Sequence, residues 1–579
     1  MTPSAIAALV ALVAVALASA AIGSYGVRVA RSTSDFLVAS RTVGPVANGG
    51  AISGEYLSAA SFLGVAGMIL LDGVDALWFP VGFTAGYLAL VLFVAAPLRR
   101  SGAYTVPDFA EARLGSPALR AVCTGFVLLI GWLYVLPQFQ GAGLTLSTLT
   151  GLPAWIGELA SGVIVVGTVA LGGMRSITFV QAFQYWLKLT AVVLPAAVAV
   201  LFFVDQDRGL DRPLPPEFRT DTTVEITTPV VLQVREPVDL VATGEVDGEV
   251  VSGAPLRWLP GEHVVGQDAE LAFTAGSSVP VVAGSPVDDR AWLAPFPAER
   301  PHGVLGTYSL IIATFLGTMG MPHVLVRFYT NPDGRAARRT AVVVLGMLGA
   351  FYVAVTLLGA MSRLYVPQLL VSGNTDAAVL LLPTAVLGSG WAGILLGGLV
   401  AAGAWAAFLS TASGLIVSVA GVLSTDVLRR RRVRDFRVAA VIAGSVPLGL
   451  ALGVERLLFS QSVALVFAVA ASTFCPLLVL GIWWRGLTDR GAVAGVLAGG
   501  LLSAGAVVVS LAGVGDDGPL GVLLYRPAIV SVPVAFLTMV VVSLLTSTRR
   551  PADVDQVLLR LHAPERLGLS RDRLRDAGS

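Results

Sequence analysis

A polar, glycine-rich segment at residues 48–67 lies within a stretch that is otherwise apolar enough to cross a membrane. It carries Glu55 and three serines, and Gly49, Gly50 and Gly54 weaken the helix locally. Ionisable and polar groups inside a span are costly, and they commonly line the path of a solute or ion. A helix interrupted by glycine can also turn its carbonyl groups towards a ligand. The segment indicates either a broken helix at a transport site or a helix whose small residues allow close packing.

A second group of oxygens, on the apolar stretch 389–424, has the chemistry of a sodium site. Ala407, Ser410 and Thr411 are spaced by three and four residues, which places them on one face of a helix. One carbonyl and two hydroxyls are uncharged, hard oxygen ligands of the kind that suit Na⁺, and a partly unwound helix near Gly54 can supply further carbonyls. The alternative is that both hydroxyls bond back to carbonyls of their own helix, which is common in membrane helices.

Two further apolar stretches are interrupted by polar residues. The segment 131–143 places Gln138 and Gln140 near Pro137 in the middle of a span. The segment 317–323 contains two glycines and a proline, which break a helix, and ends in His323, for which we expect a structural role. Glu55 differs from these residues, because a carboxylate at that depth must be protonated or matched by a positive group.

The composition indicates an integral membrane protein. Of the 579 residues, 55% are hydrophobic and only 13% are charged, whereas soluble domains carry about 25% charged residues. The net charge of +1 gives no reason to expect a nucleic-acid partner, and arginine carries nearly all of the positive charge. Cys123 and Cys475 lie in apolar runs without metal-ligand spacing. No set of nucleophile and base appears either, so we do not expect an enzyme.

About 20 apolar residues are needed to cross a bilayer, and hydropathy predicts about thirteen such helices. The expected spans are residues 5–22, 46–70, 76–97, 119–148, 156–172, 179–203, 305–327, 340–361, 389–424, 438–454, 460–484, 491–513 and 527–546. The first of these resembles a signal peptide, but the arginines follow it, which favours an uncleaved helix.

Arginine placement predicts the topology, since positive residues gather in cytoplasmic loops. The arginines expected inside are Arg99, Arg100, Arg113, Arg175, Arg335, Arg338, Arg339, Arg429–Arg432, Arg485 and Arg490. The short loops expected outside contain little beyond Arg363 and Arg456. We therefore expect a multi-pass protein of the cytoplasmic membrane, with its N-terminus outside and its C-terminus in the cytoplasm.

The polar interruption at 204–303 is then extracytoplasmic. Runs of β-branched residues such as Val230–Val234, punctuated by glycine and proline, favour a small β-rich domain. A disordered acidic linker is the alternative. The tail at 547–579 is expected in the cytoplasm, and the spacing of Val554, Val557, Leu558 and Leu561 predicts a short amphipathic helix in it.

Four separated stretches together resemble the sodium:solute symporters, and within them the bacterial cation/acetate (monocarboxylate) permeases. They are Gly54–Gly64 (GEYLSAASFLG), Gly172–Arg175 with Thr178–Gln181, Gly317–Phe328, and Leu409–Ser413 (LSTAS). The matches span most of the chain and leave out the 204–303 insert. Four motifs in this order are far more specific than any one of them alone.

The resemblance implies an all-α fold of the leucine-transporter type, built on two inverted five-helix repeats. Residues 1–203 would then form the N-terminal helix and the first repeat, and residues 304–484 the second repeat. Residues 485–546 would form the C-terminal transmembrane helices. The breaks near Gly54 and Gly320 fall at equivalent positions of the two repeats, as expected of a binding site at the bilayer midplane.

Carried over to this chain, the resemblance implies a Na⁺ site and a neighbouring substrate site. The Na⁺ ligands would be the carbonyls of Gly54, Leu57 and Ala407 and the hydroxyls of Ser410 and Thr411, with Ser58 as a further hydroxyl. The substrate would lie among Glu55, Tyr56, Ser61, Gln138, Gly317, Thr318, Gly320 and Met321. For Arg327 we expect a position flanking a membrane end rather than a counter-charge to the substrate.

The function implied is sodium-coupled uptake of a short-chain monocarboxylate of the acetate, propionate and pyruvate class, with the lipid bilayer as surroundings and protein partners unknown. Several relatives carry an acid where this chain has Gln181, and an acid or asparagine where it has Tyr56. These departures argue against a second Na⁺ and leave Glu55 as a candidate for proton coupling. The alternatives are a symporter coupled to protons or specific for another solute, and a solute sensor that does not transport.

Overall fold

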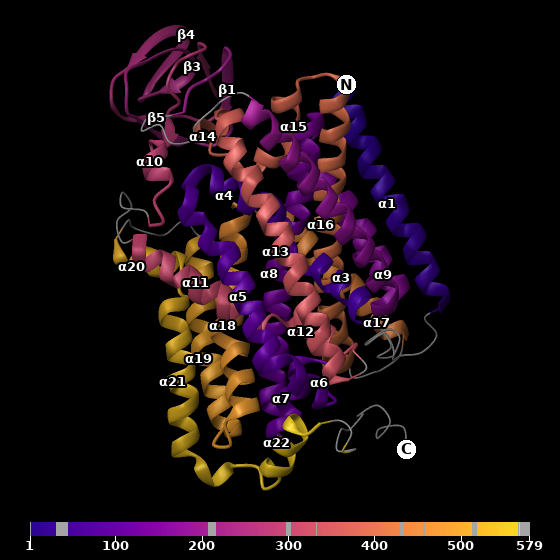
Figure 1. Cartoon of the computed structure of the whole chain (residues 1–579). Helices are drawn as coiled ribbons and strands as arrows, with labels where there is room; N and C mark the ends of the chain where they lie inside the picture. The colour runs from indigo at the N-terminus through magenta and orange to yellow at the C-terminus, as the bar shows by residue number, and fades with distance from the viewer. Residues whose placement is uncertain are drawn as a thin grey trace.

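The computed structural model describes residues 2–29, 44–205, 216–296, 303–331, 333–428, 433–454, 458–511, 518–564 and 567. These residues form a bundle of long helices with one small β domain at one end (Figure 1). Helix α1 begins at the same end, and the short C-terminal helix α22 lies at the opposite one. We call these the insert end and the tail end. Which of them faces the cytoplasm stays a prediction, and Arg429–Arg432 and Arg456, used for that prediction, lie outside the described residues.

The helices that precede the β domain pack around a buried core. They are α1 (Pro3–Val29), α3 (Pro45–Tyr56), α4 (Val65–Asp72), α5 (Trp78–Leu90), α6 (Ala96–Arg100), α7 (Val106–Leu114), α8 (Pro117–Thr150) and α9 (Ala154–Asp205). Helix α9 bends at Gly173, whose φ of 60° and ψ of −167° lie outside the helical region, so it forms two spans.

The second half follows the β domain. Its helices are α11 (Gly303–Gly320), α12 (Pro322–Phe328), α13 (Gly334–Tyr365), α14 (Gln368–Ser372), α15 (Ala378–Leu387), α16 (Trp391–Val422), α17 (Val433–Ala451), α18 (Phe459–Trp483), α19 (Asp489–Leu511), α20 (Pro519–Tyr525), α21 (Ala528–Leu545) and α22 (Val554–His562). Helix α16 packs against α9, α8 and α1, and α3 packs against α9 and α13.

Among the described residues, eleven helices are long and apolar enough to cross a membrane, so the expected count of thirteen is not confirmed. One difference arises because residues 60–100 form a single run of helical turns where two spans were expected. The other is α17, which carries Arg434, Asp435 and Arg437 near its start and is therefore too polar by composition. The mostly helical class itself is as expected.

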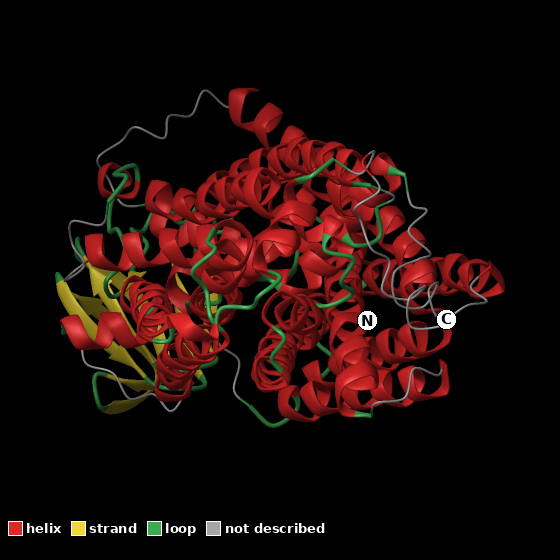
Figure 2. Cartoon of the chain, turned by 90° about the horizontal axis from the view of Figure 1, so that it is seen from below, coloured by secondary structure: helices red, strands yellow, loops and turns green. Residues whose placement is uncertain are grey.

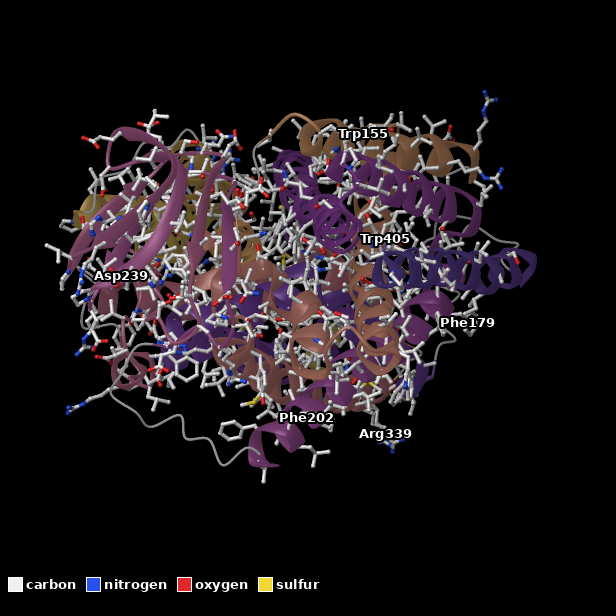
Figure 3. The ribbon with its side chains drawn as sticks, turned by 90° about the horizontal axis from the view of Figure 1, so that it is seen from above. Trp155, Phe179, Phe202, Asp239, Arg339 and Trp405 are labelled. Atoms are coloured by element: carbon white, nitrogen blue, oxygen red, sulfur yellow. The ribbon has the colours of Figure 1, made fainter. Side chains whose placement is uncertain are left out.

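Apolar side chains cover the outside of the bundle. Trp155 and Phe179 are exposed (55% and 43%), whereas Trp405 is buried. In Figure 3, which labels all three, the side chains are drawn over the ribbon as seen from the insert end. A soluble protein rarely exposes so many large apolar side chains, whereas a membrane protein presents them to lipid.

The predicted breaks are both present. Helix α3 ends at Tyr56, Leu57 leaves the helical region (ψ 89°), and a π-helical turn over Ala60–Gly64 resumes the path. Helix α11 ends at Gly320, Met321 is extended (ψ 114°), and α12 begins with Pro322. A proline at the first helical position fits this restart, because it has no N–H to donate into the preceding turn.

The insert is a folded β domain and not a disordered linker. Its strands are β1 (Thr222–Ile226), β2 (Val230–Val234), β3 (Val238–Val246), β4 (Glu249–Trp258), β5 (Gly261–Val265), β6 (Ala269–Phe273) and β7 (Val281–Val282). They form one antiparallel sheet in the order β1-β6-β3-β5-β2-β7, with β4 paired to β3. Along β3 buried and exposed residues alternate, as expected when one face of a sheet covers a core. Figure 2 shows the strands at one side of the helices.

A short helix, α10 (Asp289–Trp292), ties the β domain to the bundle. The Trp292 indole donates hydrogen bonds to the carbonyls of Ile69 (2.8 Å) and Leu70 (3.1 Å). Arg363 at the end of α13 pairs with Asp289 (3.0 Å) and lies over the Trp292 ring. The domain is thus fixed directly above the end of the first broken helix.

Candidate functional site

The candidate site residues gather where the break in α3 meets α9, α12 and α16. Gly54, Glu55, Ser410, Thr411 and their neighbours are buried. Ionisable and polar groups at the centre of a helix bundle are costly unless they pair with one another. The partners of each group therefore show what the site is built to hold.

Hydroxyl groups of α16 bridge to the open carbonyls of α3. Ser410 Oγ lies 2.6 Å from the Gly54 carbonyl oxygen and 3.0 Å from that of Ala407, and can donate its one proton to either. Thr411 Oγ1 donates to the Glu55 carbonyl (2.7 Å). The structure therefore joins the two sets of oxygens from which the sequence predicts a Na⁺ site. A hydrogen bond to a carbonyl of its own helix, that of Ala407, accounts for only one of these two Ser410 contacts.

A positive charge already sits among these oxygens. The Lys188 ammonium on α9 donates to the carbonyl of Gly54, to the carbonyl of Leu57 (2.8 Å) and to Ser410 Oγ (2.9 Å). We call the oxygens of Gly54, Leu57, Ala407 and Ser410 the cation cage. Ser58 is fully buried beside the break, but it is not one of the three described acceptors of the ammonium.

Sequence reasoning missed Lys188, although one signal was visible. Among the 38 lysine and arginine residues of the chain it is the only lysine, and it stands in the middle of a predicted span. Because every other residue of this set is arginine, the single lysine indicates a site that requires lysine. Its contact residues are more than 130 positions away, so nothing local indicates what it touches.

Glu55 forms an ion pair with Arg327, and the two belong to a second polar cluster beside the cage. Arg327 Nε lies 2.5 Å from Glu55 Oε2, and both side chains are at most 2% exposed. The other guanidinium nitrogens donate to Thr178 Oγ1 (2.9 Å) and to the amide oxygen of Gln181. The Gln181 amide in turn donates to the Ser410 carbonyl (2.7 Å). A position flanking a membrane end was expected for Arg327. Instead it is buried inside the bundle, because its guanidinium pairs with groups of α3 and α9.

Four of the expected substrate residues take part in three separate contacts. Tyr56 Oη and Thr318 Oγ1 lie 2.8 Å apart and join the two broken helices. Ser61 instead meets Tyr352 of α13 (3.1 Å). The Gln138 side-chain oxygen accepts from the Ala59 amide (3.0 Å) and so caps the turn after the first break.

Gly317 and Gly320 have a packing role in this conformation. A Cβ at either position would lie 2.4–2.5 Å from a backbone oxygen of α18, at Phe467 or Ala470. The chain needs glycine there so that α11 can approach α18 closely. Met321 is fully buried at the break, and the His323 ring lies edge-on to Tyr134 with ring centres 5.4 Å apart.

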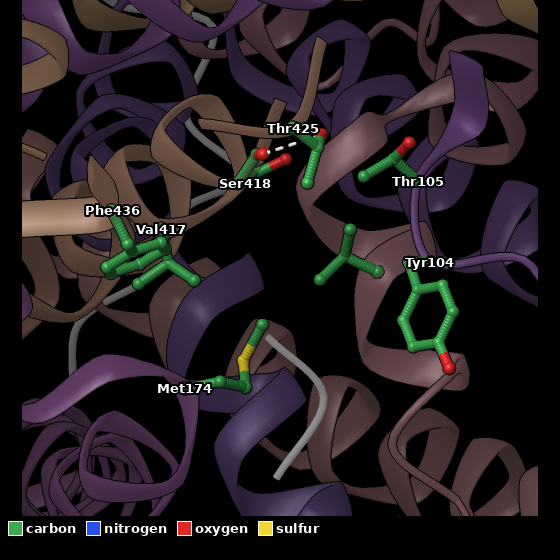
Figure 4. Close-up of a pocket in the computed structure, with 9 residues that line it drawn as sticks. Tyr104, Thr105, Met174, Val417, Ser418, Thr425 and Phe436 are labelled. Atoms are coloured by element: carbon green, nitrogen blue, oxygen red, sulfur yellow. Dashed lines mark hydrogen bonds between the residues drawn. The ribbon is translucent and has the colours of Figure 1, made fainter. Parts of the chain in front are cut away.

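A small cavity lies two helical turns further along α16, near the start of α17. Its volume is about 20 Å³, and Met174, Val417, Ser418 and Phe436 are among its lining residues (Figure 4). Such a volume holds a water molecule and is too small for an organic substrate.

The close contact of α3 with α9 sets the cage geometry and gives a first prediction. A Cβ at Gly54 would lie 2.3 Å from the Gln181 backbone oxygen, whereas a Cβ at Gly346 on α13 would meet nothing within 4 Å. We expect Gly54→Ala to lower the yield of folded protein and its thermal stability, and Gly346→Ala to leave both unchanged. Size-exclusion profiles and melting curves of the two variants measure this, and equal behaviour would contradict the assigned contact.

Comparisons with known proteins fit this architecture. A sequence model of the sodium:solute symporter family matches residues 36–212 and 296–499, on either side of the β domain. An uncharacterized symporter, YwcA, of Bacillus subtilis is 29% identical over 88% of each chain. A monocarboxylic acid transporter of Corynebacterium glutamicum is 28% identical and covers 88% of this chain and 86% of its own.

Two solved structures show the same fold. A Na⁺-coupled sialic acid symporter in an outward-open state superposes with a TM-score of 0.62 at 13% identity, covering 93% of this chain and 98% of its own. Mhp1, a nucleobase-cation-symport-1 family transporter in a closed conformation, gives a TM-score of 0.52 at 14% identity, covering 91% and 98%. The expected leucine-transporter-like architecture is thus confirmed at the level of the fold.

Proposed function

The chain belongs to the sodium:solute symporter family, and on that premise we propose that it couples the uptake of a short-chain monocarboxylate to the inward movement of Na⁺ across the cell membrane. The cation cage would bind Na⁺, and the substrate would bind beside it between the two broken helices. The family and its Na⁺-coupled structural neighbour support Na⁺ as the coupling ion.

The observation that carries the proposal is a cation held by the cage. The Lys188 ammonium stands in for a monovalent ion, and its acceptors are neutral carbonyl and hydroxyl oxygens of α3 and α16. Neutral hard oxygens at a broken helix are the ligands that transporters of this architecture offer to Na⁺. Gly54, Leu57, Ala407 and Ser410 would hold the ion directly. The Thr411 hydroxyl donates to the backbone carbonyl of Glu55 and so holds the α3 backbone in place. It would complete the site.

The charge of the cluster supports a carboxylate as substrate. At the break the buried charged side chains among the described residues are Glu55, Arg327 and Lys188. One negative and two positive groups leave an excess of positive charge, which an incoming monocarboxylate would offset. The similarity to a monocarboxylic acid transporter supports the same substrate class. Tyr56 and Thr318, whose hydroxyls join α3 to α11, are the candidates to bind the carboxylate oxygens.

The mechanism would follow from the two breaks. Na⁺ in the cage would link α3 to α16, and substrate at the Tyr56–Thr318 contact would link α3 to α11. Because α3 takes part in both contacts, each ligand would stabilise the arrangement that the other requires, and such coupling is reciprocal for binding. This arrangement accounts for symport without any chemical step.

Uptake of radiolabelled pyruvate into proteoliposomes tests the proposal. Pyruvate is preferred to acetate because its neutral acid is scarce at neutral pH and leaks little through lipid. An inward Na⁺ gradient should drive accumulation, whereas an equal K⁺ gradient and protein-free liposomes should not. Accumulation driven by a proton gradient alone would favour the alternative of proton coupling. No accumulation of pyruvate, propionate or acetate under either gradient would reject the proposed function.

A further inference from the structure

Lys188 has no role in the expected sodium site, yet its side chain fills that site. It is the only lysine of the chain and is fully buried in the second half of α9. Buried charges persist only where they are paired or well coordinated. A basic residue at this depth, in a chain that otherwise uses arginine, needs a reason specific to lysine.

The shape of the cage supplies that reason. An ammonium is a compact point charge with three donors on a flexible four-carbon stem, whereas a guanidinium is a planar fork. The three donors of Lys188 match three acceptors, namely the carbonyls of Gly54 and Leu57 and the Ser410 hydroxyl. A point charge surrounded by oxygens from two helices is also how a bound Na⁺ would be held, so lysine can imitate the ion and arginine cannot.

We propose that Lys188 is a tethered cation that fills the cage when Na⁺ is absent and that Na⁺ must displace in order to bind. This inference rests on the proposed use of Na⁺ as the coupling ion. The ammonium and Na⁺ require the same carbonyls of Gly54 and Leu57 and the same hydroxyl of Ser410. Two cations that share these ligands would be only a few ångströms apart, where like charges in a poorly polarisable interior repel strongly. The cage therefore holds one of them at a time.

A carboxylate beside the cage can bind the displaced ammonium. Glu55 follows Gly54, an acceptor of the ammonium, in the chain, so a carboxylate lies beside the cage, and the long lysine stem can swing without moving α9. Arg327 already pairs with Glu55 from the other side, so the carboxylate would be shared between two cations. Helix α16, which forms the opposite wall of the cage, carries no ionisable residue over Trp391–Val422.

The tethered cation has a consequence for the transport cycle. Open carbonyls at a helix break are costly when buried without a partner. With Lys188 in place, the carrier without Na⁺ keeps the carbonyls of Gly54 and Leu57 bonded and can close around an empty substrate site. The same residue lowers the apparent affinity for Na⁺, because part of the binding free energy displaces the ammonium.

Direct binding of ²²Na⁺ to the purified protein, without substrate, tests the inference. We expect Lys188→Gln, which keeps amide donors but removes the charge, and Lys188→Met, which keeps the apolar stem, to bind Na⁺ at least tenfold more tightly than the wild type. Gln184→Met is the matched control. Gln184 is buried one turn earlier on α9 and bonds to Ser19 of α1, so its loss should leave Na⁺ affinity unchanged.

The outcomes separate this inference from the proposed function. Equal Na⁺ affinity in the wild type and both Lys188 variants would overturn the inference and leave sodium coupling intact. Binding of Na⁺ by the variants but not by the wild type would mean that Lys188 replaces the ion permanently, which would overturn both displacement by Na⁺ and sodium coupling. If neither the wild type nor a folded Lys188 variant binds Na⁺, the cage is not a Na⁺ site and the inference fails.

A measurement on the wild type covers the case in which the variants do not fold. Because the chain has one lysine, protein labelled with ¹³C at the lysine ε carbon gives a single lysine side-chain signal in NMR. Addition of Na⁺, at constant ionic strength against choline, should shift this signal with a saturating dependence. A signal that stays unchanged while ²²Na⁺ binding saturates would overturn the inference.

Discussion

Replacing Arg327 with methionine is expected to destabilise the folded protein by about 3–5 kcal/mol, the usual cost of leaving a buried ion-pair partner uncompensated. Arg327 is 1% exposed and lies 2.5 Å from Glu55. Its other nitrogens bond to Thr178 and Gln181 of α9. The substitution would leave Glu55 without its nearest positive partner and would break the link between α12 and α9. Thermal unfolding of the purified variant in detergent measures the loss.

The matched control for this prediction is Arg339→Met on α13, because Arg339 is exposed (Figure 3) and its loss should change stability little. A second variant that combines Glu55→Gln with Arg327→Met should recover part of the loss, since the pair is then removed together. If Arg327→Met melts at the same temperature as Arg339→Met, the ion pair at the centre of the site is not as described.

Removing both hydroxyls of α16 is expected to weaken Na⁺ binding by about 10- to 100-fold. A lost hydrogen bond is worth about 1 kcal/mol, and a buried group left unsatisfied costs about 1–3 kcal/mol. With Ser410→Ala and Thr411→Ala the proposed Na⁺ site loses two oxygens, whereas the competing Lys188 ammonium loses only Ser410. The net effect is therefore a lower affinity for Na⁺, measured as the Na⁺ concentration that gives half-maximal pyruvate uptake.

Ser413→Ala provides the comparison on the same helix. Ser413 is also buried, but its hydroxyl donates to the Leu409 carbonyl of its own helix (2.6 Å), and within the described part of the chain it bonds to no other element. Its loss should leave the Na⁺ dependence unchanged. The assignment of Ser410 and Thr411 would be refuted by a double variant that requires no more Na⁺ than Ser413→Ala does.

The parts of this molecule that could be predicted from the sequence have local signals. Glycine and proline within apolar runs indicated the breaks in α3 and between α11 and α12, and hydroxyls spaced along one helix face indicated that Ser410 and Thr411 would act together. Alternation of β-branched residues indicated the β domain. Each of these features depends on residues that are neighbours in the chain, so the pattern is visible without knowledge of the fold.

The parts that could not be predicted depend on which helices meet. Glu55 and Arg327 are 272 positions apart, and Lys188 is 222 positions from Ser410. The break between α11 and α12 could be predicted, but the helices that α12 meets after it could not. Arg327 was therefore expected at a membrane end, whereas its partners lie on α3 and α9. Likewise a single lysine in an apolar run gives no indication of the oxygens it will meet.

Sodium-coupled monocarboxylate transport is tested most directly by measuring whether a pyruvate gradient drives ²²Na⁺ into proteoliposomes. Proteoliposomes with equal Na⁺ on both sides, a trace of ²²Na⁺ outside and an inward pyruvate gradient contain no other driving force for Na⁺. Coupled symport predicts that ²²Na⁺ accumulates inside while the pyruvate gradient lasts, and that the double variant of Ser410 and Thr411 shows less accumulation at limiting Na⁺. Entry of ²²Na⁺ at the same rate with and without pyruvate would contradict it.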